Sequence, residues 1–122
     1  MELQNMKNKE FVFACLHRLQ QAGALTEGVL AVLTDPEACR REFCMSGGFA
    51  VLLEVPPHCT EEQLKELCHV GAKRRYYQDR FRHGERVFAA VNHWYGPGRS
   101  MPDNRTPFLQ WAERLPGTKE AR

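Results

Sequence analysis

A short apolar run in the middle of the chain, from Phe49 to Val55, sets the expected fold class. The run lies between a Gly-Gly pair and the prolines Pro56 and Pro57, and a short bounded run of this kind favours a buried strand over a helix. The prolines end the strand because proline donates no hydrogen bond to a sheet. A chain that places such a strand among helical segments is expected to form a small sheet covered by helices.

Three helices are predicted before this strand. Apolar residues recur at three- and four-residue spacing over residues 5–22, and Gly23 is a natural stop for that helix. Thr26 is suited to cap a short second helix, because its hydroxyl can accept from a backbone N–H of the first turn. Asp35-Pro36 begins a third helix that runs to about Met45, with proline at the first helical position.

Two further helices are predicted after the strand. Thr60-Glu61-Glu62-Gln63 forms a capping box, which begins a helix that ends near Gly71. The glycines and prolines of residues 95–105 predict an irregular loop. Thr106-Pro107 is then expected to cap a last helix, which ends at Pro116-Gly117.

The segment 75–94 is predicted to be a β-hairpin that turns near Gly84, because its aromatic and β-branched residues favour strands. A three-residue loop at the turn would place Phe81 on the same face as Val87. The alternative is a helix from Ala72 to Phe81.

The predicted order of elements is therefore α-α-α-β-α-β-β-α. This is an α+β fold with a small three-stranded sheet, made of one strand plus a β-hairpin, covered by about five helices. The chain has 122 residues, the size of one domain, which we place at residues 1–117 with a frayed tail at 118–122. If the first two strands pair in parallel, the helix between them forms a right-handed crossover.

Composition predicts a cytoplasmic protein without a membrane partner. No apolar run approaches the ~20 residues that span a bilayer, and the charged N-terminus is unlike a signal peptide. The cysteines are odd in number and form no Cys-x-x-Cys pair, so we expect free thiols in a reducing compartment rather than a disulfide framework. They are Cys15, Cys39, Cys44, Cys59 and Cys68.

Positive charge is concentrated in one segment. Residues 1–60 carry five basic and seven acidic side chains, whereas residues 61–122 carry twelve basic and eight acidic ones. The segment Lys73–Arg86 alone holds six basic and two acidic residues. This segment therefore dominates the positive field of the chain and indicates an anionic partner.

Aromatic residues alternate with the cations of this segment, a pattern typical of nucleic-acid contacts. Guanidinium groups pair with phosphates, and exposed rings stack on bases. The same groups suit an acidic protein surface. Alternatively, the rings pack in the core and the arginines form an ordinary solvated face. The candidate binding residues are Lys73, Arg74, Arg75, Tyr76, Arg80, Arg82, His83 and Arg86, together with Arg99 and Arg105 of the following loop.

Metal binding and catalysis have weaker support. His58-Cys59 and Cys68-His69 resemble two halves of a zinc site, but an intervening helix that rises about 1.5 Å per residue separates the cysteines by roughly 13 Å. Cys44 and Ser46 offer a thiol and a hydroxyl for nucleophilic catalysis, and no signature pairs either with a histidine. We therefore predict no metal, no cofactor and no catalytic residue.

Two tryptophans, Trp94 and Trp111, either form an interface hot spot or attach the last helix to the hairpin. The preferred hypothesis is a non-enzymatic binding or accessory domain that contacts nucleic acid through the basic aromatic hairpin. The first alternative is a protein-interaction module, such as an inhibitor, an immunity-like protein or a small homo-oligomer, that uses the same hairpin or the tryptophans. A small cysteine-dependent hydrolase is the remote alternative.

Overall fold

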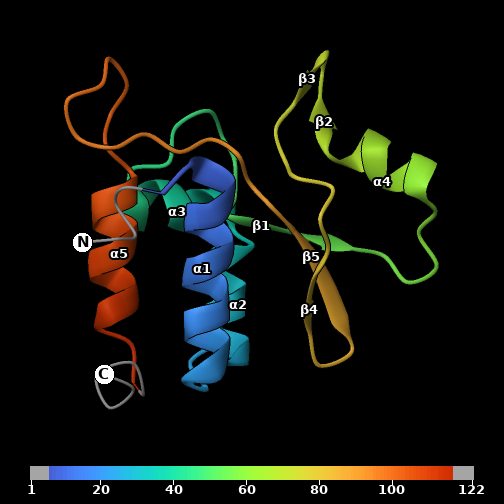
Figure 1. Ribbon diagram of the computed structural model, residues 1–122, viewed down its shortest axis with the longest axis horizontal. Helices are drawn as coiled ribbons and strands as arrows, with labels where there is room; N and C mark the ends of the chain where they lie inside the picture. The colour runs from blue at the N-terminus through green and yellow to red at the C-terminus, as the bar shows by residue number, and fades with distance from the viewer. Residues whose placement is uncertain (1–5, 117–122) are drawn as a thin grey trace.

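The structure is a computed structural model that describes residues 6–116. Helices lie on both sides of a small sheet, and a second, smaller hairpin lies at one edge (Figure 1). The predicted α+β class is therefore confirmed, whereas the predicted tail at 118–122 lies outside the described residues. The helices are α1 (Asn8–Gln21), α2 (Glu27–Leu33), α3 (Pro36–Phe43), α4 (Glu61–Leu67) and α5 (Arg105–Glu113), and the strands are β1 (Leu52–Val55), β2 (His69–Val70), β3 (Lys73–Arg74), β4 (Phe81–His83) and β5 (Arg86–Ala90).

The main sheet has the order β1-β5-β4 and is antiparallel throughout. Leu52 pairs with Ala90 and Val55 pairs with Val87, so the last strand of the chain occupies the centre. The parallel pairing considered for the first two strands does not occur. The helix α4 instead leads into the separate two-stranded sheet formed by β2 and β3.

The predicted strand over residues 75–82 is mostly wrong, and the alternative helix does not form either. Only Phe81–His83 is a strand in this region, and Tyr76 adds an isolated bridge to Val91. Tyr76 is buried, and its hydroxyl donates to the Ala50 carbonyl oxygen at 2.9 Å. The irregular path brings this ring into the core with its polar end satisfied.

The hairpin turn is shorter than predicted. His83 pairs with Arg86, so the loop has two residues rather than three. Gly84 occupies its first position at φ 62°, a left-handed conformation that glycine adopts without a Cβ penalty.

This shorter turn shifts the register by one residue. Phe81 lies opposite Phe88, and not on the face of Val87 as predicted. Because side chains alternate across a strand, a one-residue shift exchanges the two faces. Phe88 is fully buried whereas Val87 is half-buried, so the observed register places both phenylalanine rings in the core.

The predicted helix starts are largely confirmed by their side-chain caps. The Thr26 hydroxyl accepts from the Val29 N–H at 3.2 Å, and the Asp35 carboxylate accepts from the Glu37 N–H at 3.1 Å. Thr60 also forms the full predicted capping box with Gln63. These contacts are local, so the sequence pattern alone identifies them.

Several helix boundaries differ from prediction. The helix α1 begins at Asn8 rather than near residue 5, and α5 ends at Glu113 rather than at Pro116-Gly117. The helix α3 ends at Phe43 because Cys44 adopts a left-handed conformation at φ 61°. The helix α4 ends at Leu67 because the next residues pair in the β2–β3 hairpin. The helix α5 begins at Arg105 with Asn104, not Thr106, at its N-cap position, and the Asp103 carboxylate accepts from the Thr106 N–H.

The two tryptophans attach α5 to the rest of the core. The Trp94 ring centre lies 5.0 Å from that of Phe108, and the Trp111 ring centre lies 4.8 Å from that of Phe43. Trp94 is 2% exposed, and its indole N–H donates to the Val91 carbonyl oxygen. The structural role considered for these rings is therefore observed, and Trp94 is not an exposed hot spot.

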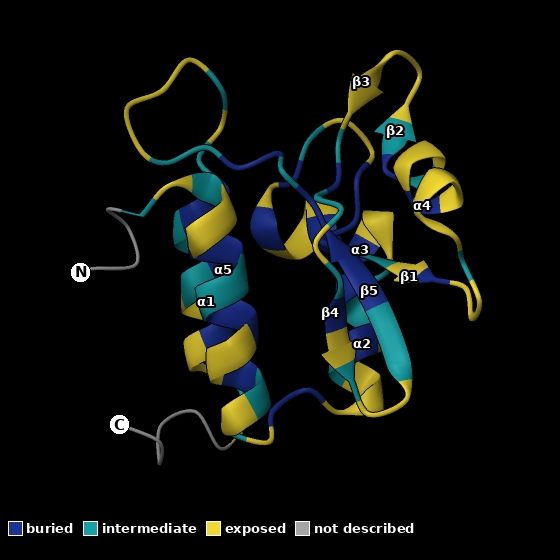
Figure 2. Cartoon of the chain, turned by 45° about the vertical axis from the view of Figure 1, so that its right-hand side comes forward, coloured by how far each residue is buried: buried dark blue, intermediate teal, exposed yellow. Residues whose placement is uncertain are grey.

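Burial divides the elements clearly: the inner faces of α1 and β5 are buried, whereas β3 and the loop after Gly96 are exposed (Figure 2). All five cysteines are free thiols. Between residues 6 and 116, no helix is long and apolar enough to cross a membrane.

Candidate functional site

The predicted binding residues do not form one continuous surface. Tyr76 and Arg105 are buried, and His83 is half-buried at the hairpin turn. Arg80 and Arg86 form salt bridges. The remaining cations have no salt bridge within the described part of the chain, and these are Lys73, Arg74, Arg75, Arg82 and Arg99.

Carboxylates compensate the charges of Arg80 and Arg86. Arg86 binds both carboxylate oxygens of Glu54, at 2.8 and 3.0 Å, and one oxygen of Glu27 at 2.9 Å. Its hydrogen bonds lower the pKa of Glu54 and raise the pKa of Arg86 itself. Arg80 lies 2.6 Å from Glu61. These two arginines therefore tie the hairpin to neighbouring elements rather than presenting free charge.

His83 also has a structural role. Its Nε2 donates to the Leu25 carbonyl oxygen at 3.0 Å, and its Nδ1 lies 3.1 Å from the Gln20 amide nitrogen. The Gln20 amide also donates to the Arg82 carbonyl oxygen. The turn of the main hairpin is thereby held against the end of α1, and both ring nitrogens of His83 have a hydrogen-bond partner.

The exposed cations of β3 lie beside the segment that follows β5. The Asn92 backbone N–H donates to the Arg75 carbonyl oxygen at 2.8 Å, and the Asn92 side chain donates to the Arg74 carbonyl oxygen at 2.9 Å. Lys73 and Arg74 are exposed and Arg75 is half-buried. The Arg75 Nε atom is buried and has no hydrogen-bond partner among the described residues.

A row of rings extends from Arg75. Its guanidinium carbon lies 5.2 Å from the Phe49 ring centre, within cation–π distance. The Phe49 and His93 ring centres are 5.1 Å apart, as are those of His93 and Tyr95. Tyr95 is half-buried and ends the row.

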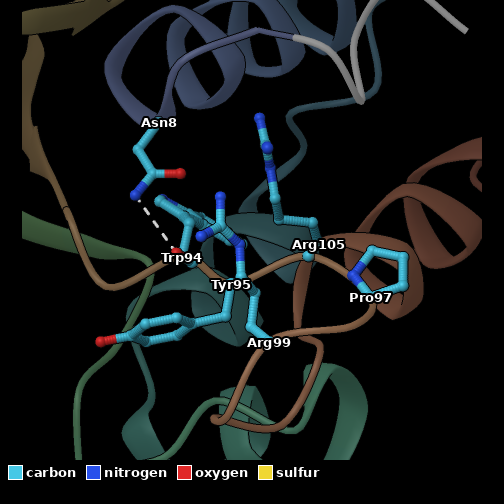
Figure 3. Close-up of a pocket in the computed structure, with 7 residues that line it drawn as sticks. Asn8, Trp94, Tyr95, Pro97, Arg99 and Arg105 are labelled. Carbon is cyan, nitrogen blue, oxygen red and sulfur yellow. Dashed lines mark hydrogen bonds between the residues drawn. The ribbon is translucent and has the colours of Figure 1, made fainter.

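Beyond Tyr95 lies a cavity of about 520 Å³ between α1 and the 96–103 loop (Figure 3). The side chains of Arg99 and Arg105 extend in the same direction there, toward α1 (Figure 3). Arg105 is 8% exposed, lies 4.1 Å from the Phe11 ring centre and donates to the Met6 carbonyl oxygen. The lining residues are Asn8, Trp94, Tyr95, Gly96, Pro97, Arg99 and Arg105.

Two asparagines fix the walls of this cavity. Asn104 is 1% exposed, and its side chain accepts from the Tyr95 N–H at 2.8 Å and donates to the His93 carbonyl oxygen at 2.9 Å. Asn8 donates from α1 to the Trp94 carbonyl oxygen at 3.2 Å. The sequence named Arg99 and Arg105 but missed Asn8, because its contact spans 86 residues and leaves no local pattern.

A second cavity, of about 470 Å³, lies on the main hairpin. Arg80, Arg82 and Arg86 line it, so the structure does bring three predicted cations together. Glu54 and Glu85 line it as well, and they reduce its positive charge. The net positive charge of its described lining is therefore lower than that of the first cavity, whose described lining holds no carboxylate.

Nucleophilic chemistry is represented by one hydrogen bond, which joins Ser46 Oγ to His93 Nε2 at 3.0 Å. Burial lowers the pKa of His93, and the nearby charge of Arg75 lowers it further, so the ring is neutral at pH 7. Cys44, which the sequence offered as a thiol nucleophile, is exposed after α3. No carboxylate within residues 6–116 hydrogen-bonds His93, so the pair lacks the third member of a triad.

No group of three or more His, Cys, Asp or Glu side chains in the described ranges converges as a metal site.

Comparisons with known proteins found no matching protein family, no matching curated protein and no matching solved structure.

Proposed function

We propose that the chain is a non-enzymatic binding domain that contacts nucleic acid along one edge of the fold. We call this the basic edge, and it consists of Lys73, Arg74, Arg75 and Arg99. The observation that carries the proposal is that these cations have no carboxylate partner among the described residues, whereas Arg80 and Arg86 are paired.

The placement of these residues supports a single extended contact. The β2–β3 tip and the 96–103 loop lie on the same side of the molecule, at the top of both views (Figures 1 and 2). The Asn92 hydrogen bonds and the ring row that ends at Tyr95 connect them. Cations spaced along an edge, with a half-buried tyrosine between them, suit a phosphate backbone and a stacked base.

The proposal moves the contact surface away from the β4–β5 turn. To bind a phosphate, Arg86 would have to give up its charge-assisted hydrogen bonds to Glu54 and Glu27. The net gain in binding free energy would therefore be small. Unpaired cations lose no such contacts when they bind a phosphate.

Binding of single-stranded DNA, RNA and duplex DNA by fluorescence anisotropy tests the proposal. If all four cations contact phosphates of a single strand, log K should fall with log salt at a slope of about −3. The double variant Lys73→Gln/Arg74→Gln should weaken binding and reduce this slope by about 1.4. Both side chains are exposed, and neither forms a salt bridge among the described residues, so the double variant should fold normally.

The matched control is Arg18→Gln/Arg114→Gln, which removes the same charge. Both arginines are exposed. Arg18 lies in the last turn of α1, and Arg114 directly follows α5. If both double variants weaken nucleic-acid binding equally, the effect depends only on net charge, and the basic edge is not a specific contact surface. Absence of binding to all three nucleic acids at low salt would exclude the proposed function and leave an acidic protein surface as the partner class.

A further inference from the structure

We propose that the cavity between α1 and the 96–103 loop binds a phosphate monoester, and that its source is the terminal phosphate of a nucleic-acid strand. The inference rests on the proposed function and deepens it by assigning the strand end. Arg99 and Arg105 line one side of this cavity and no carboxylate is among its described lining residues. The cavity on the main hairpin differs in this respect, because Glu54 and Glu85 line it.

The floor of the cavity is held in place by contacts that do not involve a ligand. Arg105 is fixed by Phe11 and by the Met6 carbonyl oxygen, and Asn104 fixes the two ends of the loop. A site with a prearranged guanidinium group loses little conformational entropy when its ligand binds. Only Arg99, which is exposed, needs to be ordered.

The charge in the cavity favours a dianion. Burial lowers the pKa of Arg105, Cys15 and Asp103 act in the opposite direction, and the charge of Arg99 adds a smaller lowering. An anion between the two guanidinium groups would relieve their repulsion. A phosphate monoester carries close to two charges at neutral pH, and its three terminal oxygens suit the fork of the exposed Arg99, while Arg105 contributes its positive charge from the wall of the cavity.

The position of the cavity favours the end of a strand over an internal phosphate. The cavity lies at one end of the basic edge, and Tyr95 belongs both to its lining and to the ring row that leads to Arg75. A strand whose terminal phosphate occupies the cavity can therefore continue past Tyr95 toward Arg74. The cavity volume of about 520 Å³ also accommodates a small ligand, since such sites span roughly 300–1,000 Å³.

The test compares two oligonucleotides of one sequence, with and without a 5′-phosphate, each labelled at its 3′ end. A second pair carries the phosphate at the 3′ end. We expect one phosphorylated strand to bind about tenfold more tightly than its hydroxyl counterpart, because the added hydrogen bonds are charge-assisted. Arg99→Gln should abolish this preference, and Arg114→Gln, which removes an exposed cation directly after α5, should preserve it.

The basic-edge variant Lys73→Gln/Arg74→Gln separates the two proposals. It should weaken phosphorylated and hydroxyl strands by the same factor and leave their ratio unchanged. Equal binding of all strands by the native protein would overturn the terminal-phosphate site and leave the proposed function standing.

Inorganic phosphate and a nucleoside monophosphate, used alone and as competitors, distinguish the sources of the monoester. The site is supported if the nucleoside monophosphate competes with the phosphorylated strand and if this competition is lost in Arg99→Gln. Binding of that nucleotide without binding of any oligonucleotide would support a phosphate site in the cavity, but it would overturn both the assignment to a strand end and the proposed function. If neither small phosphate nor any strand binds in an Arg99-dependent manner, the inference is wrong.

Discussion

At the scale of single residues, buried polar side chains determine the path between β5 and α5. Asn104 bridges the Tyr95 N–H and the His93 carbonyl oxygen, and His93 in turn contacts Ser46. A buried polar group without a partner costs about 1–3 kcal/mol, so this set of bonds strongly restricts the conformation of the loop. The walls of the proposed phosphate cavity therefore depend on residues that do not themselves carry charge.

His93 should make the protein less stable in mild acid. Its pKa is lowered from the ordinary value of 6.5 in the folded state, chiefly by burial and then by the charge of Arg75. Well above pH 6.5 the ring is neutral in both states, and its titration does not affect the free energy of unfolding. As the pH falls below this value, the unfolded state takes up the proton first and the free energy of unfolding decreases.

Urea unfolding of the native protein and of His93→Gln across this pH range measures the effect. The glutamine variant retains a group that can hydrogen-bond Ser46 but does not titrate, so its stability should change less with pH. Parallel pH profiles for the two proteins would show that His93 does not produce the acid sensitivity.

At the scale of elements, short helices here depend on their ends. The helix α4 has seven residues, too few to be stable without caps or tertiary contacts. Its capping box satisfies both the Gln63 N–H and the Thr60 N–H. Leu64 is its one buried residue, so the cap contributes an unusually large share of its stability.

Thr60→Ala should therefore destabilise the protein by about 1 kcal/mol, because it leaves the Gln63 N–H without its acceptor. Chemical denaturation measures the change. Thr60→Ser, which keeps the hydroxyl, is the matched control and should lose much less. An alanine variant as stable as the serine variant would mean that the cap is replaced by water at no cost.

At the scale of the whole molecule, one connected set of buried residues extends from α1 to α5. Phe108 is fully buried at its centre, with ring centres 5.2 Å from Phe43 and 6.2 Å from Phe11. The N-terminal helices and the C-terminal helix thus share one core. This arrangement supports the prediction that the chain unfolds as a single cooperative domain.

Phe108→Ala should reduce the free energy of unfolding by about 3–5 kcal/mol, because it removes a buried ring and leaves a cavity. For each protein taken separately, tryptophan fluorescence and far-ultraviolet circular dichroism should report one common unfolding midpoint. Leu109→Ala, at a half-buried position on the same helix, should cost less. Two separate transitions would contradict a single domain.

The sequence by itself determined the fold class, the helix starts at Thr26, Asp35 and Thr60, and the strand that ends at Val55. These features follow from interactions between residues close in the chain, such as a hydroxyl and an N–H three positions apart. It also identified the basic segment, because charge is a property of composition. The register of the hairpin was wrong by one residue, since both registers give plausible strands locally.

Only the tertiary structure decided which cations are compensated. The partners of Arg86 are Glu27 and Glu54, which are 59 and 32 residues away, and the partner of Arg80 is Glu61, 19 residues away. The cavity walls depend likewise on Asn8, which reaches Trp94 from the other end of the chain. Such contacts depend on how helices and sheet pack in three dimensions, and no periodicity in the sequence records that packing.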